Sequence, residues 1–228
     1  MRGVLVAGGT GALGAGVLRV LLEAGHPVTA TWLVDRERER VEAEFEGADR
    51  LSLVQADLME PDGAEAAVRA TPDMGAVVNL VGGFASGPLA HETPIEDYER
   101  MLDLNLRPGF LLVKAAFPSL LDAGGGAYVG VSARPALQPF KGSAAYSTAK
   151  AAVLAFVRAL DADYAKDGIR ANAILPSVID TPANRAATPD ADFSKWVQPD
   201  AIGRVVRFLI SDDSAPTSGA AIPVYGHA

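Results

Sequence analysis

The chain has 228 residues, and its 49% hydrophobic content supports one sizeable core without requiring a second domain. It contains no cysteine, which excludes disulfides and thiolate sites, and its three histidines (His26, His91 and His227) are too dispersed to predict a metal site. The net charge of -8 disfavours nucleic acid and anionic membranes as partners. No apolar run reaches the ~18 residues of a membrane span, and a strand beginning by residue 3 leaves no room for a signal peptide, so we expect a soluble, cytoplasmic protein.

The chain begins with a predicted strand, a glycine loop and a helix. Val4 to Ala7 is an apolar run typical of a buried strand, and an amphipathic helix follows the glycines and ends near Ala24. Glycine in such a loop permits a tight turn and close approach to a pyrophosphate, and the helix N-terminus favours the negative phosphates. The spacing of Gly9, Gly11 and Gly14 is therefore the dinucleotide-binding fingerprint. The predicted site comprises Gly8, Gly9, Thr10, Gly11, Ala12, Leu13 and Gly14.

The second predicted strand, residues 28–33, bears on the choice of cofactor. A carboxylate at its end would bind the ribose 2′-hydroxyl of NAD, whereas an arginine would hold the 2′-phosphate of NADP. Trp32 stands at this place, with Asp35 and Arg36 just beyond it. Trp32 and Arg36 are candidate cofactor contacts, and NAD and NADP both stay open. We interpret the alternating Arg and Glu residues from 36 to 40 as a solvated helix face.

The rest of the chain repeats the alternation of strand and helix. Further strands are predicted at 51–55, 76–81, 127–131, 169–175 and 220–224, and helices at 36–46, 61–70, 95–121, 144–166 and 200–210. This order predicts an α/β fold: a doubly wound parallel sheet of about seven strands with helices on both faces, in a single Rossmann domain over 1–228. The long irregular segment 177–199 at the binding edge is predicted to be a substrate lid.

Several polar residues fall near the predicted binding edge. Asn79 interrupts the apolar fourth strand, where it either caps a neighbouring backbone group or supports a ligand. Pro108 has no N–H for the carbonyl of Leu104, so helix 95–121 is expected to kink beside Asn105. Ser132 stands at the carboxyl end of the fifth strand, the edge at which ligands bind in such sheets.

Tyr146 and Lys150 lie four residues apart in a predicted helix and therefore share one face. A tyrosine with an ordinary pKa of ~10 transfers protons poorly at neutral pH, but a cation beside it favours the phenolate. The pair can therefore perform acid/base chemistry. An ordinary helix with a buried tyrosine and a solvated lysine would show the same pattern.

Taken together, these residues resemble the short-chain dehydrogenase/reductase (SDR) family over nearly the whole chain. The residues that carry the resemblance, in order, are those of 8–14, Asp57, Asn79, Asn105, Ser132, Tyr146, Lys150, those of 167–176, and Ser218 with Gly219. The resemblance implies that Tyr146 is the general acid/base and that Lys150 lowers its pKa and contacts the nicotinamide ribose. It also implies that Ser132 holds the substrate oxygen and that Asn105 anchors a water joining Lys150 to solvent.

For the cofactor, NAD or NADP, the resemblance implies contacts along the whole binding edge. Asp57 would meet the adenine ring, Asn79 would support the cofactor at the fourth strand, and Thr181 would contact the carboxamide. The remaining implied contacts are Leu58, Val81, Gly82, Pro176, Val178 and Ile179. The chain departs from the family pattern at Ala7, where threonine is usual, and at Ser177, where glycine is usual. Ser132 precedes Tyr146 by fourteen residues, one more than the commonest spacing, so the loop 133–140 must absorb an insertion.

A narrower similarity to the dihydropteridine reductases of this family occurs in segments 82–87, 175–185 and 189–196. Those enzymes generally lack the site serine because their substrate is a quinonoid imine, so Ser132 favours a carbonyl or alcohol here. The leading hypothesis is hydride transfer between NAD(P)(H) and a small carbonyl or alcohol. Pterin reduction and a non-catalytic NAD(P)-binding sensor or scaffold are the alternatives. By resemblance, we expect a homo-oligomer, a tetramer or dimer, formed through helices 95–121 and 144–166.

Overall fold

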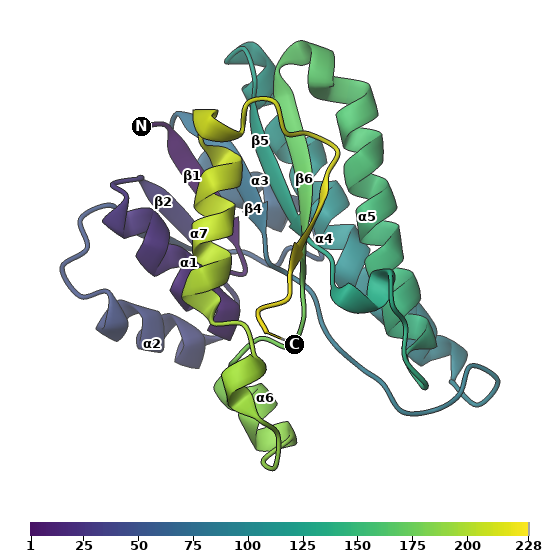
Figure 1. The fold of residues 1–228 in the computed structure, drawn as a ribbon. Helices are drawn as coiled ribbons and strands as arrows, with labels where there is room; N and C mark the ends of the chain where they lie inside the picture. Colours follow the sequence, from purple (N-terminus) through teal and green to yellow (C-terminus); the bar gives the residue numbers. More distant parts are fainter. Residues whose placement is uncertain (228) are drawn as a thin grey trace.

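The computed structural model describes residues 1–227, and Ala228 of the predicted domain 1–228 lies outside them. In this part of the chain, strands and helices alternate around a single sheet (Figure 1). The strands are β1 (Gly3–Ala7), β2 (Val28–Trp32), β3 (Leu51–Gln55), β4 (Met74–Asn79), β5 (Gly126–Val131), β6 (Ile169–Pro176) and β7 (Ala221–Val224). The helices are α1 (Ala12–Glu23), α2 (Asp35–Glu44), α3 (Pro61–Arg69), α4 (Ile95–Asp122), α5 (Ala144–Tyr164), α6 (Pro182–Ala187) and α7 (Pro199–Ile210). Short 3-10 helices are η1 (Arg134–Ala136), η2 (Ala165–Asp167), η3 (Phe193–Lys195) and η4 (Asp212–Ser214).

Within residues 1–227, the seven strands form one parallel sheet in the order β3-β2-β1-β4-β5-β6-β7. The predicted doubly wound fold is therefore confirmed. The strand order reverses between β1 and β4, and ligands in open α/β sheets bind outside the carboxyl ends of the strands at such a point. The loop after β1, the loop after β4 and the loop after β5 all open at this edge.

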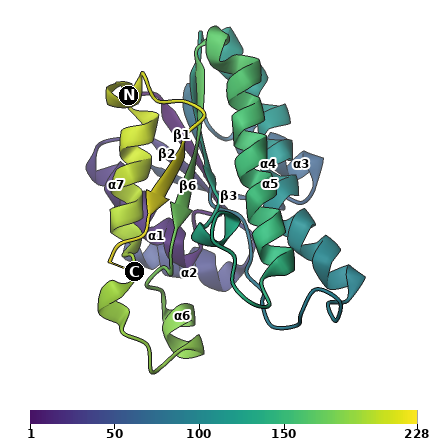
Figure 2. The ribbon, with the colours of Figure 1, turned by 45° about the vertical axis from the view of Figure 1, so that its right-hand side comes forward.

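Helices cover both faces of the sheet (Figure 2). On one face, α3, α4 and α5 pack on the strands through a core that includes Leu112, Phe117 and Val157. On the other, α1, α2 and α7 pack through a second core that includes Leu18 and Val206. A parallel sheet covered on both faces favours strands that are apolar on both sides, as in β1 (GVLVA) and most of β4 (MGAVVN).

The first and last helices on one face, α1 and α7, approach each other closely through glycine. A methyl group at Gly16 of α1 would lie 2.4 Å from the side chain of Pro199. A methyl group at Gly203 of α7 would lie 2.9 Å from the carbonyl oxygen of Gly16. Glycine at both positions therefore brings the two backbones together and fixes α7 beside the start of α1.

The structure differs from the sequence-based boundaries in two informative places. Strand β4 begins at Met74 and ends at Asn79, because the Asn79 side chain accepts a hydrogen bond from the N–H of Val81 and turns the chain. The segment 177–199, predicted as irregular, contains the short helix α6. Thr181 caps α6 by accepting from the N–H of Asn184, and Pro182 occupies the first turn, which is a favourable helix start.

Helix α4 continues through Pro108, which leaves the carbonyl of Leu104 without its usual helical donor. Its buried side faces the sheet and α5. Among the helices of residues 1–227, none combines the length and the apolar character that crossing a membrane requires.

Candidate functional site

The glycine loop after β1 has the geometry of an anion cradle. Gly8 has φ 72°, a conformation that favours glycine, and its N–H donates to the Thr31 hydroxyl at 2.8 Å. A methyl group at Gly14 would lie 2.1 Å from the carbonyl oxygen of Gly9, so only glycine lets α1 approach the loop this closely. Gly11 caps α1 without a side chain, which leaves the first N–H groups of the helix free for an anion. The loop thus fits a dinucleotide pyrophosphate.

Two residues of α2 reach the glycine loop, and sequence reasoning missed both of them. Arg40 donates to the carbonyl oxygen of Thr10 at 2.5 Å, and a carboxylate oxygen of Glu37 lies 3.4 Å from the Thr10 hydroxyl. The interpretation of residues 36–40 as a solvated face was therefore incomplete. The helical spacing of Glu37 and Arg40 directly after a cofactor-side strand was the available signal.

The other predicted contacts near the adenosine end are differently placed. The guanidinium of Arg38 lies over the Trp32 ring at 5.2 Å from its centroid, while Arg36 is exposed. Asp57 is exposed and accepts a hydrogen bond from the N–H of Met59, so part of its carboxylate stabilises its own turn. Leu58 is buried in the core under α3, so only its backbone could contact a cofactor.

Asn79 serves the fold at the end of β4. Its side-chain oxygen accepts from the N–H of Val81 at 3.1 Å, and its amide hydrogen-bonds the hydroxyl of buried Tyr128. The side chain therefore bonds the backbone of its own turn, two residues further along the chain. The support of a cofactor by Asn79 stays a prediction.

Gly82, Asn105 and Lys150 meet beside this turn. The Asn105 side chain accepts from the N–H of Gly83 at 3.1 Å and donates to the carbonyl of Gly83 at 3.2 Å and to that of Met101 at 2.9 Å. A methyl group at Gly82 would lie 2.6 Å from the Asn105 side-chain oxygen and 3.0 Å from the Lys150 Nζ. Asn105 therefore clamps the loop after β4 against the lysine.

The surroundings of Ser132 do not favour the role that the resemblance implies for it. Its hydroxyl is buried and donates to the backbone carbonyl of Lys150 at 2.7 Å. This bond ties the end of β5 to α5, so the hydroxyl is already engaged inside the fold. Ala133, which follows it, offers no polar side chain. The Ser132 hydroxyl lies inside the fold, and its role in holding a substrate oxygen stays a prediction.

Tyr146 lies in the first turn of α5, and Lys150 lies one turn later. The Lys150 Nζ donates to the carbonyl of Val131 at 3.0 Å and lies 5.9 Å from the centroid of the Tyr146 ring. The Phe84 ring meets the Tyr146 ring edge-on, with centroids 4.9 Å apart. The structure therefore brings the proposed proton-transfer pair to the carboxyl end of β5.

Burial sets the protonation states of this pair. Desolvation raises the pKa of Tyr146 to about 12 and lowers the pKa of Lys150 to about 8. In the cofactor-free site, burial acts on Tyr146 in the direction opposite to the one expected from Lys150, so a lowering of the Tyr146 pKa by Lys150 stays a prediction. At neutral pH, the site holds a neutral phenol beside a protonated lysine, which suits a proton donor.

The end of β6 and the lid segment that follows it hold four further predicted contacts. Pro176 ends β6, Ile179 forms a bridge with Val197, and Val178 is exposed. The Thr181 hydroxyl accepts from the N–H of Asn184, which leaves its own hydrogen available for a ligand acceptor. These residues follow directly on the carboxyl end of β6, next to the Tyr146 side of the sheet edge.

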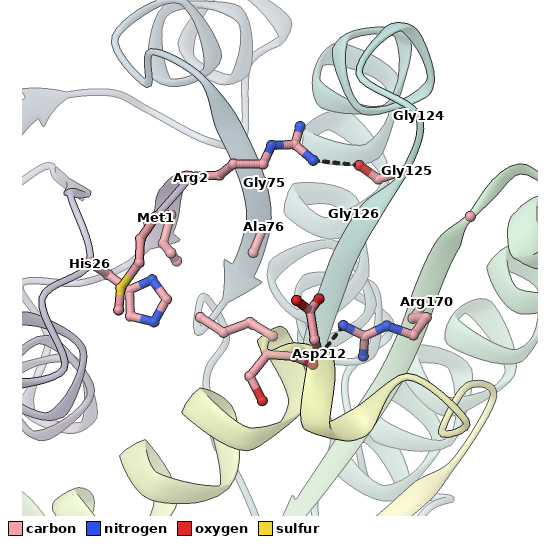
Figure 3. Close-up of a pocket in the computed structure, with 14 residues that line it drawn as sticks. Met1, Arg2, His26, Gly75, Ala76, Gly124, Gly125, Gly126, Arg170 and Asp212 are labelled. Carbon is pink, nitrogen blue, oxygen red and sulfur yellow. Dashed lines mark hydrogen bonds between the residues drawn. The ribbon is translucent and has the colours of Figure 1, made fainter.

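A cavity of about 540 Å³ lies at the opposite, amino-terminal edge of the sheet (Figure 3). Its two arginines are committed to backbone carbonyls: Arg2 donates to Gly125 at 2.9 Å, and Arg170 donates to Leu209 at 2.7 Å. These bonds connect the chain near the amino ends of β1 and β6 to the turn before β5 and to the last turn of α7. Neither Tyr146 nor Lys150 lines this cavity. Within residues 1–227, no group of three or more His, Asp or Glu side chains is arranged so that it could bind a metal ion.

Comparison with known proteins decides the family. The model of the family "short chain dehydrogenase" matches residues 2–192 of the chain. The chain belongs to this family. It is an NAD(P)-dependent short-chain dehydrogenase/reductase, and its relatives are named dehydrogenases and reductases.

Two curated relatives illustrate the range of the family. The chain is 31% identical over 198 residues to 2-(R)-hydroxypropyl-CoM dehydrogenase from Xanthobacter autotrophicus, with 78% of each chain covered. It is 28% identical over 228 residues to acetoacetyl-CoA reductase from Paracoccus denitrificans, covering 95% of this chain and 93% of that relative.

Solved structures agree with the fold. A short-chain type dehydrogenase/reductase from Mycobacterium ulcerans matches with a TM-score of 0.92 at 25% identity, over 99% of this chain and 89% of that one. ElxO, solved with NADP bound, matches with a TM-score of 0.91 at 22% identity, over 99% of this chain and 98% of that one. At 22% identity, the likeness to ElxO concerns the fold alone.

Proposed function

We propose that this SDR enzyme reduces a small carbonyl substrate, or oxidises the corresponding alcohol, with Tyr146 as the general acid/base. The observation that carries the proposal is the pair of half-buried Tyr146 and buried Lys150 at the carboxyl end of β5, beside the turn at Gly82. Proton donation at this place requires a group that carries its proton at neutral pH and regains the proton after each reaction. A neutral phenol next to a lysine of lowered pKa meets that requirement.

The glycine loop supports the cofactor side of the proposal. Its cradle and the uncapped start of α1 suit a pyrophosphate. The bound nicotinamide supplies or accepts the hydride. The chain offers features for both dinucleotides, since the Glu37 carboxylate lies beside Thr10 and Arg36 is exposed nearby. Parallel titrations with NADH and NADPH decide between them.

In the reductive direction, the residues have distinct tasks. The phenol of Tyr146 gives its proton to the substrate oxygen as the carbonyl carbon is reduced. The Lys150 ammonium, held by the carbonyl of Val131, stabilises the resulting phenolate and returns a proton to it. Asn105 holds the loop that carries Gly82 and, within this proposal, anchors a water between Lys150 and solvent.

Tyr146→Phe tests the proposal because it removes only the phenolic hydroxyl. Loss of general acid/base catalysis typically slows turnover ~100- to 10,000-fold, so NAD(P)H oxidation with a panel of ketones should fall by that factor. NAD(P)H binding, measured by fluorescence titration, should be retained. Equal rates in parent and variant contradict the role of Tyr146. Cofactor binding without turnover across the panel in the parent would instead support the sensor or scaffold alternative.

Pterin reduction is the second candidate, and the state of Ser132 favours it. The Ser132 hydroxyl already donates to the carbonyl of Lys150, and a quinonoid imine has no carbonyl at the reacting bond that would need this donor. The similarity of segments 82–87 and 175–185 to dihydropteridine reductases points the same way. An NADH-coupled assay with quinonoid dihydropterin decides, and inactivity with this substrate removes the candidate.

We also propose that the enzyme is a homo-oligomer, a dimer or tetramer, that pairs through α4 and α5. Phe110 on α4 is 56% exposed and its ring lies 6.3 Å from that of Phe156 on α5, which gives this face an aromatic patch. Light scattering coupled to size exclusion should show more than one chain per particle, and Phe110→Glu should shift it toward the monomer. A monomeric parent contradicts this assembly.

A further inference from the structure

The lid segment, residues 177–199, is closed at its base by main-chain hydrogen bonds. Ile179 and Val197 form an isolated parallel bridge. The N–H of Asp180 donates to the carbonyl of Val197 at 2.8 Å, and the N–H of Val197 donates to the carbonyl of Val178 at 2.9 Å. The entry and exit of the segment are thus joined, and its middle forms a small loop that is anchored at both ends.

The Asp180 side chain accepts the hydrogen bonds that hold together the two ends of the lid segment. Arg185 donates to both of its carboxylate oxygens, from Nε at 2.5 Å and from a terminal nitrogen at 2.7 Å, and Gln198 donates a third bond at 2.6 Å. The Asp180 side chain is only 5% exposed, although the lid around it is largely exposed. The bonds from Arg185, followed by that from Gln198, lower its pKa to about 2. The carboxylate therefore remains charged and bonded throughout the working pH range of an enzyme.

Arg185 connects Asp180 to the aromatic side chains in the middle of the lid segment. Its guanidinium lies over the Phe193 ring, 4.6 Å from the centroid, and the Phe193 ring lies 4.7 Å from that of Trp196. Arg185 itself lies in α6, and its main-chain N–H donates to the carbonyl of Thr181, the residue that caps this helix. The Arg185 side chain therefore links α6, on which it stands, to Asp180 and to Phe193 of η3. A planar guanidinium can bind both oxygens of a carboxylate and an aromatic face at once.

The backbone between Val178 and Thr181 is held by these partners. The Asn184 side chain donates to the carbonyl of Ile179 at 2.8 Å, and its N–H donates to the Thr181 hydroxyl. Val178, Ile179 and Thr181 are the lid residues proposed to contact the cofactor. Their main chain is thus fixed from the lid side in the cofactor-free protein.

We propose that Arg185 is a positioning residue, which, through Asp180 and Phe193, holds residues 178–181 in the form that receives the nicotinamide end of the cofactor. The inference rests on the proposed function and extends it to the lid. A preformed site avoids the entropy of ordering a loop at the moment of binding, so Arg185 should act on cofactor affinity more than on the chemical step. If Arg185 served only the stability of the fold, its removal would lower the free energy of unfolding without changing cofactor affinity.

The test uses the full-length protein with the variants Arg185→Met and Arg185→Lys. Arg69→Met is the matched control, because Arg69 makes an exposed pair with Glu65 at 3.3 Å on α3. Hydrogen exchange of residues 178–198 without cofactor reports the order of the lid. Steady-state kinetics give the KM for NAD(P)H and kcat, and fluorescence titration gives the cofactor Kd without requiring turnover.

In Arg185→Met, exchange in residues 178–198 and the cofactor Kd should both rise at least about tenfold, the scale of one lost charge-assisted hydrogen bond, while kcat changes less than about twofold. The exchange rate and the Kd of Arg185→Lys should lie between those of the parent and of Arg185→Met, since lysine keeps the charge but cannot bind both carboxylate oxygens as a guanidinium does. Arg69→Met should match the parent. Unchanged exchange, or faster exchange with unchanged Kd, overturns the inference. A parent that binds cofactor without turnover contradicts the proposed oxidoreductase function, yet the Kd comparison still decides the role of Arg185.

Discussion

The binding edge of the sheet has two halves that are built in different ways. In the proposed cofactor half, residues 8–14 and 79–83, a methyl group would collide with the backbone of Gly9 at Gly14 and with the side chain of Asn105 at Gly82. The proposed substrate half, residues 84–94, 133–143 and 177–199, presents exposed apolar side chains, including those of Phe84, Phe140 and Val178. The shape of the cofactor half depends on glycines that leave room for close contacts, whereas the shape of the substrate half depends on exposed side chains.

Because of this difference, substitutions in the two halves should have different effects on stability and binding. Where backbones touch, a substitution must move the main chain, so it changes stability and cofactor binding together. Where exposed side chains face solvent, a substitution rarely changes stability by more than about 0.5 kcal/mol, although it can change what binds. The cofactor half should therefore tolerate little variation, and the substrate half should vary with substrate.

Gly14→Ala tests the cofactor half most severely. Alanine favours helices by ~1 kcal/mol over glycine, so propensity alone predicts stabilisation. The clash with the carbonyl of Gly9 at 2.1 Å predicts the opposite, a loss of about 1–3 kcal/mol in unfolding free energy and loss of NAD(P)H binding. Thermal unfolding and cofactor titration measure both. Gly47→Asn is the control, since Gly47 has nothing within 4 Å of an added methyl and asparagine tolerates its φ of 78°. A stabilised Gly14→Ala that binds cofactor contradicts the comparison.

Lys150 lies where the two halves meet, and its titration should shape the pH profile. Reduction needs the neutral phenol and the charged ammonium, and the pKa values are about 12 for Tyr146 and about 8 for Lys150. The kcat for reduction should therefore be level below about pH 8 and fall about tenfold per pH unit above it. Lys150→Arg should move the fall to higher pH, because a guanidinium stays charged. A fall at the same pH in parent and variant would assign it to another group.

Phe84→Ala tests the substrate half. Phe84 is 63% exposed, so its removal should change unfolding free energy by less than about 0.5 kcal/mol. An aromatic contact contributes ~0.5–1.5 kcal/mol, so kcat/KM should fall about 2- to 10-fold for flat, ring-bearing substrates and stay near the parent value for small aliphatic ketones. The ratio of the two kcat/KM values checks this. A marked loss of stability would show that Phe84 belongs with the rigid half.

His26, far from both halves, should give the smallest effect. Burial lowers its pKa below the ordinary 6.5, so the fold favours the neutral ring. Its contribution to stability is present above pH 6.5 and is lost as the pH falls and the ring must be protonated. His26→Gln should flatten the decline in melting temperature between about pH 7 and pH 5. His91→Gln at an exposed position is the control, and equal slopes in parent and His26→Gln contradict the prediction.

The fold followed from periodicity and glycine placement, because apolar strand runs and a loop that excludes side chains are both visible in a sequence. The pairing of Tyr146 with Lys150 was accessible for the same reason, since helical spacing is local. Ser132 was not, because the direction of a side chain at the end of a strand depends on where α5 packs. The pKa of Tyr146 depends on burial by Phe84 and its neighbours, which are distant in the sequence. The helix start at Thr181 and Pro182 was readable but was outweighed by the prolines around it.

The contact between Gly16 and Pro199 has a consequence for biosynthesis. The helix that carries the phosphate-binding N-terminus packs against a helix encoded near the end of the chain, and β1 pairs with β2 and β4 at the centre of the sheet. A ribosome that has released only the first hundred residues has therefore exposed a nucleotide-binding loop without the helix that supports it. The enzyme should acquire cofactor affinity late in translation, and C-terminal truncations before residue 199 should abolish a function encoded at the opposite terminus.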